Sequence, residues 1–170
     1  VAVARTQSEL QAVAALLESR YAERGYVLSC SEADPATDLV LMAVECGDAI
    51  GTLTLRLDGP RGLRADETFR EQLDAARAAG RCVCELGRLA VAGTRRSSAA
   101  VNALFAGAHE LVRDRPEITD VFIEVNPRHA AFYRRAFGFE IAGAERTCPR
   151  VLAPAVLLRL EVAAFETSTD

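Results

Sequence analysis

Apolar positions recur along this chain with two periods, one typical of helices and one typical of strands. Spacings of three and four residues predict four helices, three of which are followed by a glycine that suits a helix end. Short apolar runs and strict alternation predict seven strands. The predicted order is β-α-β-β-α-β-α-β-α-β-β, over residues 2–5, 8–25, 39–46, 49–57, 66–79, 82–92, 101–112, 121–125, 127–137, 140–146 and 155–162.

Local signals punctuate this pattern. Ser8 with Gln11 three residues later forms a capping box that predicts the start of the first helix. A tight turn is expected at Gly47-Asp48, and Asn126-Pro127 predicts another helix start. No linker or repeat divides the chain, so we predict one α/β (α+β) domain over 1–165 with a frayed tail at 166–170. Its mixed, mostly antiparallel sheet carries helices on its faces.

Composition narrows the chemistry. The chain has 170 residues and a net charge of −4, and its 20 basic residues are all arginine, which excludes a lysine Schiff base. Only His109 and His129 are histidines, so a metal site of histidines or of the usual Cys-His zinc spacing is not expected. Five cysteines without CxxC spacing predict a reduced, cytoplasmic protein. No apolar run reaches the ~18 residues of a membrane span, and the acidic total argues against nucleic-acid binding.

The strand at 82–92 is apolar yet carries Glu85 and Arg88. A carboxylate within an apolar strand has its pKa raised by desolvation, which suits a general base. The alternative is a buried Glu85–Arg88 ion pair that only holds the sheet together. Residues three apart on a regular strand face opposite ways, so both enter one cleft only where the strand is irregular, and Gly87 is the expected bulge.

The loop at 93–98 joins this strand to the next predicted helix. Such a junction offers backbone N–H groups and the positive helix end to an anion. Arg95 and Arg96 add positive charge there, and Ser97 or Ser98 is suited to cap the helix. The alternative is a solvated loop with an ordinary helix cap.

Residues Asn126 to Phe139 resemble the N-x-x-x-x-x-F-Y-x-x-x-F-G-F segment of the GCN5-related N-acetyltransferase (GNAT) superfamily. Residues Cys84 to Val91 resemble the E-x-x-R-[LF]-x-V segment of FeeM-like N-acyl amino acid synthases and of the related acyl-homoserine-lactone synthases. Three further stretches are similar to those of the N-acyl amino acid synthases: Gly51–Asp58, Asp66–Phe69 and Thr147–Arg150.

This resemblance implies a GNAT-like fold and a set of site residues. Tyr133 is implied as the acid for the leaving thiolate, Asn126 as a donor to the pantetheine arm, and the backbone of Leu89, Ala90 and Val91 as the holder of the thioester carbonyl. Glu85 and Arg88 complete the catalytic set. Arg20, Tyr21 and Tyr26 correspond to acceptor contacts in the lactone synthases, although a packing role is the alternative. Cys148 is expected to be an inert buried thiol.

The implied reaction is transfer of a fatty acyl group from an acyl carrier protein or CoA thioester to the amino group of an amino acid. The thioester is a co-substrate, and no tightly bound cofactor or metal is implied. Acetyl-CoA enzymes of the superfamily carry Q/R-x-x-G-x-G/A, whereas this chain has Arg96-Ser97-Ser98-Ala99-Ala100-Val101. The missing glycines favour a carrier-protein donor, and such carriers are acidic. The alternatives are an acetyl-CoA-dependent acetyltransferase and a non-catalytic acyl-binding regulatory domain.

Overall fold

The computed structural model describes residues 1–26, 33–93 and 97–163. Those residues contain seven strands and four helices in the predicted order. The elements are β1 (Ala2–Val3), α1 (Gln7–Ala22), β2 (Asp38–Glu45), β3 (Asp48–Leu57), α2 (Asp66–Ala78), β4 (Val83–Val91), α3 (Ser97–Arg113), β5 (Asp120–Val125), α4 (Pro127–Phe137), β6 (Glu140–Cys148) and β7 (Ala153–Glu161). The mixed α/β class with a mostly antiparallel sheet is therefore confirmed. The predicted tail at 166–170 lies outside the described residues.

The chain forms two compact units, and β4 contributes residues to both. Unit 1 comprises Val1–Arg56 and Leu86–Arg115, and unit 2 comprises Leu57–Glu85 and Pro116–Asp170. The strands follow the order β1-β2-β3-β4-β5-β7-β6, so the first four strands run through unit 1 and the last four through unit 2. None of the helices in the described ranges is both long and apolar enough to cross a membrane.

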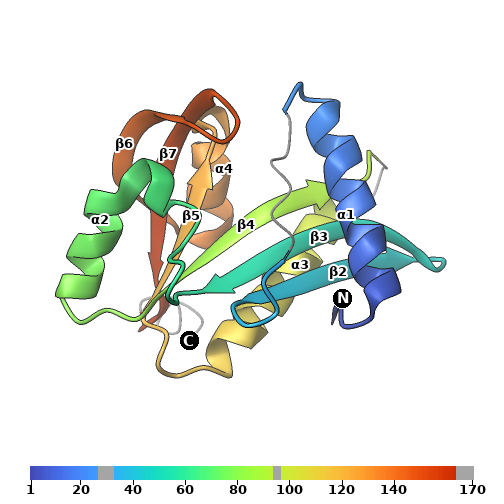
Figure 1. Ribbon diagram of the computed structural model, residues 1–170, viewed down its shortest axis with the longest axis horizontal. Helices are drawn as coiled ribbons and strands as arrows, with labels where there is room; N and C mark the ends of the chain where they lie inside the picture. The colour runs from blue at the N-terminus through green and yellow to red at the C-terminus, as the bar shows by residue number, and fades with distance from the viewer. Residues whose placement is uncertain (27–32, 94–96, 164–170) are drawn as a thin grey trace. The chain divides into compact units, whose positions relative to one another are not determined.

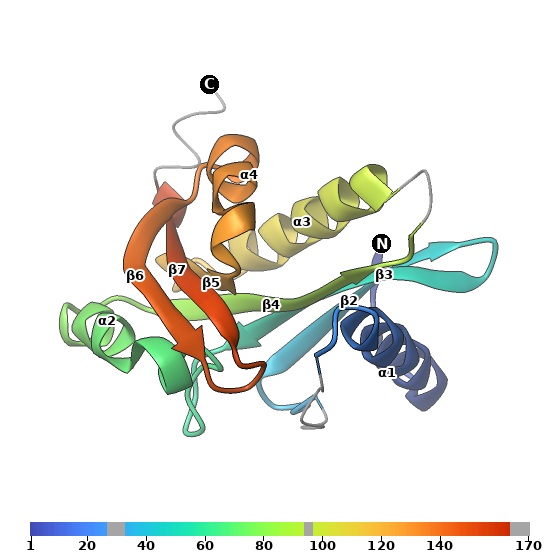
Figure 2. The same cartoon turned by 90° about the horizontal axis from the view of Figure 1, so that it is seen from above.

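In unit 1, α1 and α3 lie on opposite faces of the strands (Figures 1 and 2). The apolar stripe of α1 packs onto β2 because its buried residues recur at helical spacing. Strands β1 and β3 both pair antiparallel with β2. The buried cluster beneath α1 comprises Ala4, Val13, Leu17, Val40, Met42 and Ala90.

Two local predictions in unit 1 are wrong by one or two residues. Helix α1 begins after Thr6, whose side chain accepts a hydrogen bond from the Glu9 N–H, and the Glu9 carboxylate accepts from the Thr6 N–H. This capping box replaces the predicted Ser8–Gln11 pair, since a charged carboxylate bonds the N–H groups at the positive helix end more strongly than an amide. The β2–β3 turn is formed by Cys46 and Gly47, at φ 53° and 91°, rather than by Gly47-Asp48. Two consecutive positive φ values match the twist of a two-residue hairpin.

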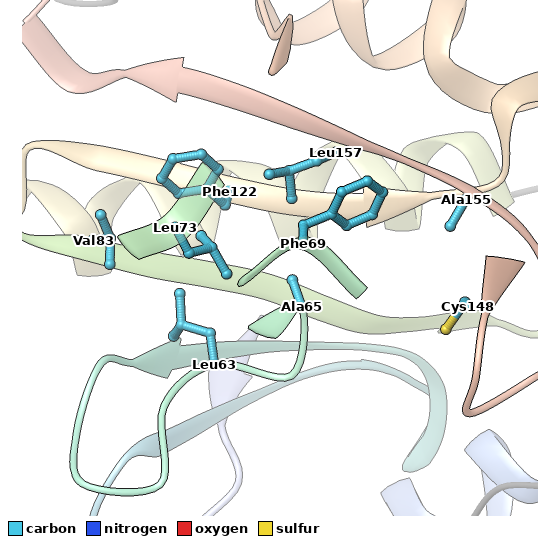
Figure 3. Close-up of a cluster of buried hydrophobic side chains, with 9 residues drawn as sticks. All are labelled: Leu63, Ala65, Phe69, Leu73, Val83, Phe122, Cys148, Ala155 and Leu157. Atoms are coloured by element: carbon cyan, nitrogen blue, oxygen red, sulfur yellow. The ribbon is translucent and has the colours of Figure 1, made fainter. Parts of the chain in front are cut away.

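In unit 2, α2 and α4 lie on opposite faces of β5, β7 and β6 (Figures 1 and 2). Strand β7 pairs antiparallel with both β5 and β6. Helix α4 begins and ends as predicted, because the Asn126 side chain accepts from the Arg128 N–H and Gly138 ends the helix at φ 75°. Figure 3 shows the core on the α2 face, formed by Leu63, Ala65, Phe69, Leu73, Val83, Phe122, Cys148, Ala155 and Leu157.

Phe69 lies at the centre of this core and interrupts its own helix. Its side chain is fully buried, and its backbone leaves helical geometry at φ −129° and ψ 35°, so α2 is kinked there. The first turn of α2 is thereby aimed differently from the rest of the helix. Gly143 on β6 gives the Phe69 ring its space, because a Cβ at Gly143 would lie 2.8 Å from Cδ1 of Phe69 and 3.0 Å from Cβ of Leu157.

We expect Gly143→Ala to destabilise the protein by about 1–3 kcal/mol, since overpacking a filled core forces neighbouring groups to move. Urea unfolding at neutral pH measures this change. The matched substitution Gly107→Ala lies within α3, where the new Cβ meets the ends of the Val1 and Leu41 side chains at 3.2 Å and 3.5 Å. It should be neutral or stabilising because alanine favours the helix by about 1 kcal/mol over glycine. Equal effects at both sites would contradict the packing argument.

Asp120, at the start of β5, is the centre of a polar network in unit 2. Its side chain is fully buried and accepts hydrogen bonds from Nε of Arg81 at 2.5 Å, Nε of Arg159 at 2.6 Å and Oγ1 of Thr119 at 2.6 Å. Arg81 also binds Glu161 at 2.7 Å, which links the segment after α2 to β7. Burial alone would raise the pKa of Asp120, but the bonds from Arg81, Thr119 and Arg159 hold that pKa below its usual range.

Candidate active site

Glu85 is a carboxylate buried on the α2 face of unit 2. Only 3% of the residue is exposed, and its Oε2 accepts one hydrogen bond from the Ala65 N–H at 3.2 Å, just before the first turn of α2. Burial raises the pKa of Glu85, while the charges of Arg64 and Arg150 oppose that rise and the charge of Glu124 adds to it. Glu85 is therefore a strongly desolvated acid with a higher proton affinity than a surface carboxylate.

Glu124, on β5, lies beside this carboxylate and is held from two sides. The Thr68 hydroxyl donates to its Oε1 at 2.8 Å, and Nη2 of Arg150 donates to its Oε2. Arg150 lies in the turn between β6 and β7, and its Nη1 donates to the Arg64 carbonyl at 2.5 Å. The β6–β7 turn, β5 and the start of α2 are thus joined around Glu85 by a network of charged hydrogen bonds.

The charges of Arg64 and Arg150 lower the pKa of Glu85 against the effect of burial, and the expected partnership of Glu85 with Arg88 stays a prediction. Strand β4 is irregular as predicted, but the unusual backbone is at Arg88, with φ 53°, and not at Gly87. A positive φ in a residue with a Cβ costs on the order of 1 kcal/mol and redirects the side chain. The left-handed residue is thus Arg88, next to the glycine expected to form the bulge, and Arg88 belongs to unit 1.

Tyr133 is a residue of α4 and Asn126 is the N-cap of that helix, which lies on the opposite face of the unit 2 strands from α2 (Figure 2). The Tyr133 side chain is buried and packs against Phe132 and Phe137, with ring centroids 5.2 Å and 6.3 Å away. Asn126 accepts the Arg128 N–H through Oδ1 at 3.2 Å, so this bond does not use its amide NH₂ group.

The remaining residues of the predicted donor site belong to unit 1. Leu89, Ala90 and Val91 form the end of β4, and Ala90 is buried. Helix α3 begins at Ser97, so it includes Ser98, whose side chain is exposed. Arg95 and Arg96 lie outside the described residues. The structure therefore describes the strand and the helix of the predicted anion site but not the loop that carries its charge.

Four other candidates from the sequence are Arg20, Tyr21, Tyr26 and Cys148. Arg20 forms an ion pair with Glu23 at 2.5 Å, and Tyr21 packs edge-on against Tyr26 at 6.2 Å. Cys148 is buried on the α2 face, and burial raises the pKa of its thiol, which disfavours the thiolate that a nucleophile needs. No group of three or more His, Cys, Asp or Glu side chains able to hold a metal ion is found in the part of the chain that the structure describes.

Comparison with known families decides which of the sequence resemblances holds. Residues 12–161 match the model of one family, described as N-acyl amino acid synthase FeeM. The chain belongs to the FeeM family. It is thus an enzyme, an N-acyltransferase with the GNAT fold. A search of curated protein sequences finds no match.

Solved structures agree with this assignment. FeeM from uncultured soil microbes, an N-acyl amino acid synthase, aligns with a TM-score of 0.88 at 23% identity, over 98% of both chains. The AHL synthase LasI aligns with a TM-score of 0.68 at 21% identity, over 93% of this chain and 85% of LasI. An acyl-CoA N-acyltransferase from Pseudomonas aeruginosa aligns with a TM-score of 0.64 at 19% identity, over 91% of each chain. At these identities the structural alignments establish the shared fold.

Only some of the residues around Glu85 in this FeeM-family enzyme carried a signal in the sequence. Thr68, Cys148 and Arg150 fall within the stretches that resemble N-acyl amino acid synthases, yet nothing in the sequence assigned them a role. Glu124 gave the same signal as Glu85, a carboxylate inside an apolar strand, and could have been found by it. Arg64 follows Gly62 and Leu63 in the loop before α2 and carried no signal of its own.

Proposed function

We propose that this enzyme transfers a fatty acyl group from a carrier-protein or CoA thioester to the α-amino group of an amino acid. The observation that carries the proposal is Glu85: a carboxylate that is 3% exposed, whose pKa is raised by burial, in a chain of the N-acyl amino acid synthase family. Burying a carboxylate is costly even where cations such as Arg64 and Arg150 act on it, and the raised pKa of Glu85 reflects that cost. A proton-accepting role explains its presence.

An acceptor that arrives as an ammonium ion first gives one proton to solvent, because only the neutral amine can attack. The reaction of that amine then needs one proton removed and one delivered. The amine nitrogen attacks the thioester carbonyl carbon, a C–N bond forms, and the C–S bond then breaks. Glu85 takes the proton that the amine loses, directly or through one water, and Tyr133 gives its phenolic proton to the departing thiolate. The proton on Glu85 then returns to the phenolate through solvent, which restores both groups. The carbonyl oxygen is held by N–H groups of the Leu89–Val91 backbone.

We expect Tyr133→Phe to lower kcat by about 10²-fold with an alkyl thioester donor, because the thiolate then leaves without a proton. An aryl thioester donor, whose thiolate is a weaker base, should recover most of the lost rate in the variant and change the wild-type rate little. Single-turnover kinetics with both donors measure this. An equal loss with both donors would mean that Tyr133 serves packing rather than proton transfer.

An acyl carrier protein is our preferred donor. The positions that carry glycine in acetyl-CoA enzymes are filled here by Ala99 and Val101, whose side chains crowd a diphosphate. Helix α4 exposes Arg128, Arg134 and Arg135, which attract an acidic carrier, and the amide of Asn126 at its start is free to donate to the pantetheine arm. The loop arginines Arg95 and Arg96 complete the expected charge.

The decisive experiment incubates the purified enzyme with a mixture of the natural amino acids and acyl donors of several chain lengths, each supplied both on carrier protein and on CoA. Mass spectrometry then detects N-acyl amino acids. Formation of such a product, faster from the carrier protein, is the expected result. Turnover of acetyl-CoA onto other amines in its place would support the acetyltransferase alternative, and donor binding without turnover would support a regulatory acyl-binding domain.

A further inference from the structure

An amino-acid acceptor brings a negative charge to the site along with its amine. The carboxylate is bonded to the same carbon as the α-amine, so a base that reaches the amine is only a few ångströms from the carboxylate. Desolvating that carboxylate without a cationic partner would be costly. If the enzyme acts as proposed above, a cation near Glu85 must bind the acceptor's carboxylate.

Arg64 and Arg150 are cations whose charges act on Glu85, and Glu124 and Glu67 also contact Arg150. The cluster therefore sets carboxylates and arginines together and has a partner for each charge of a zwitterion: an ammonium group beside Glu85 and a carboxylate beside an arginine. A simple amine would use only the first of these partners. The cluster therefore favours an amino acid over an amine that lacks the carboxylate.

The guanidinium of Arg150 is fixed by two hydrogen bonds and keeps further N–H groups that can donate to a ligand. Its Nη1 is bonded to the Arg64 carbonyl, its Nη2 to Glu124, and Glu67 lies 3.6 Å from Nη1. Among the described residues, its hydrogen bonds use two of the five N–H groups that a guanidinium carries. Its side chain is 22% exposed, whereas that of Glu124 is 6% exposed, so Arg150 is the member of this pair that a solute reaches.

Three segments fix the direction of this guanidinium. The β6–β7 turn supplies Arg150 itself, the loop before α2 supplies the Arg64 carbonyl, and β5 supplies Glu124, which Thr68 holds in turn at 2.8 Å. A guanidinium fixed in this way loses little side-chain freedom when it binds a ligand, and its planar fork matches a carboxylate.

We propose that Arg150 binds the carboxylate of the amino-acid acceptor, and that Glu124 and Thr68 position Arg150 for this role. The acceptor's ammonium group then lies toward Glu85. The enzyme in this way selects α-amino acids by their two opposite charges, independently of their side chains.

The test compares two acceptors: an amino acid that the assay above shows to be acylated, and the carboxamide of that same amino acid. The wild type should prefer the acid by about 10²-fold or more in kcat/KM. Arg150→Gln should lose about 10²-fold on the acid, mainly through KM, and keep its rate on the amide, so that the preference disappears. Arg150→Lys, which keeps the charge without the fork, should retain about a tenth of the preference.

Arg146→Gln is the matched control. Arg146, on β6, also bonds a backbone carbonyl, that of Thr68 at 3.1 Å, and a carboxylate, that of Glu71 at 3.2 Å, but its side chain is 41% exposed. It should leave the acid-to-amide preference unchanged. Equal losses on both acceptors in Arg150→Gln, or a selective loss in Arg64→Gln instead, would overturn the assignment.

The experiments distinguish failure of the proposed function from failure of the Arg150 assignment. If no amino acid is acylated by the wild type, the function and this assignment fall together. If amino acids are acylated but the Arg150 variants keep the preference, the assignment alone is wrong. Should Arg150→Gln not fold, as circular dichroism would report, Arg150→Lys decides the question, because it keeps a cation beside Glu124.

Discussion

Replacing Glu85 with glutamine is expected to lower kcat by about 10²–10⁴-fold while the fold is kept, the range found when a general base is removed. The amide still accepts the Ala65 N–H but takes no proton from the amine. Steady-state kinetics with carrier-protein donor and amino acid measure the loss. Donor binding should be unchanged, because Glu85 acts on the acceptor.

The pH dependence of the two enzymes should differ in the same way. Burial raises the pKa of Glu85, so the wild-type kcat/KM should fall as the pH is lowered through a value above that of an ordinary glutamate, where the base becomes protonated. The glutamine variant should lack this limb. Glu71→Gln, at a side chain 82% exposed on α2, is the control and should keep both the rate and the profile of the wild type.

Stability separates a catalytic Glu85 from a structural one. A carboxyl whose pKa is higher in the folded than in the unfolded protein costs stability once the pH exceeds its unfolded value, since the folded state then holds an ionised group that it disfavours. The glutamine variant should therefore melt at a higher temperature than the wild type at neutral pH. A lower melting temperature would show that Glu85 serves as one half of a stabilising ion pair.

Asp120→Ala is expected to destabilise the protein by about 2–4 kcal/mol at neutral pH, because loss of a buried anion leaves its cationic partners uncompensated. The expected loss is somewhat smaller than for a fully buried ion pair, because the side chains of Arg81 and Arg159 are 27% and 39% exposed and water can solvate them in the variant. Urea unfolding of both proteins gives the difference. Asp74→Ala is the control, because Asp74 is 56% exposed and makes one ion pair, with Arg77 at 2.8 Å. It should cost less than about 1 kcal/mol.

The difference between wild type and Asp120→Ala should depend on pH with a definite sign. The pKa of Asp120 is lower in the folded protein, so its contribution is complete above the unfolded value of about 3.9 and is lost as the pH falls through the folded value. The two unfolding free energies should converge in acid. A gap that stayed constant down to low pH would show that the lost stability came from packing and not from charge.

The order of elements could be predicted because it depends on short-range periodicity. The helix from Pro127 to Phe137 was predicted to the residue, since its cap, its first-turn proline and its terminal glycine are all local. The start of α1 was predicted two residues too late. Thr6-x-x-Glu9 and Ser8-x-x-Gln11 both have capping-box spacing, and only the charge of Glu9 distinguishes the two. The positive φ of Cys46 was equally hidden, because a cysteine gives no turn signal.

The site shows the same division. Glu85 could be found because a charge within an apolar strand is a local anomaly. Its surroundings could not, because Arg64, Glu124 and Arg150 are brought to it by the loop before α2, by β5 and by the β6–β7 turn, which are far apart in sequence. Arg88 satisfied the spacing of a known motif, but no rule of strand periodicity predicts a left-handed arginine.

The way the chain is divided between its two units limits how the enzyme can be recombined. Each unit is built from two separate stretches, and the boundary between Glu85 and Leu86 lies inside β4. No single cut releases either unit, and a fragment ending at Glu85 would carry the proposed base without the rest of its strand. Chimaeras of FeeM-family enzymes must therefore exchange both stretches of a unit together, with the join in β4 placed so that the backbone at Arg88 is inherited whole.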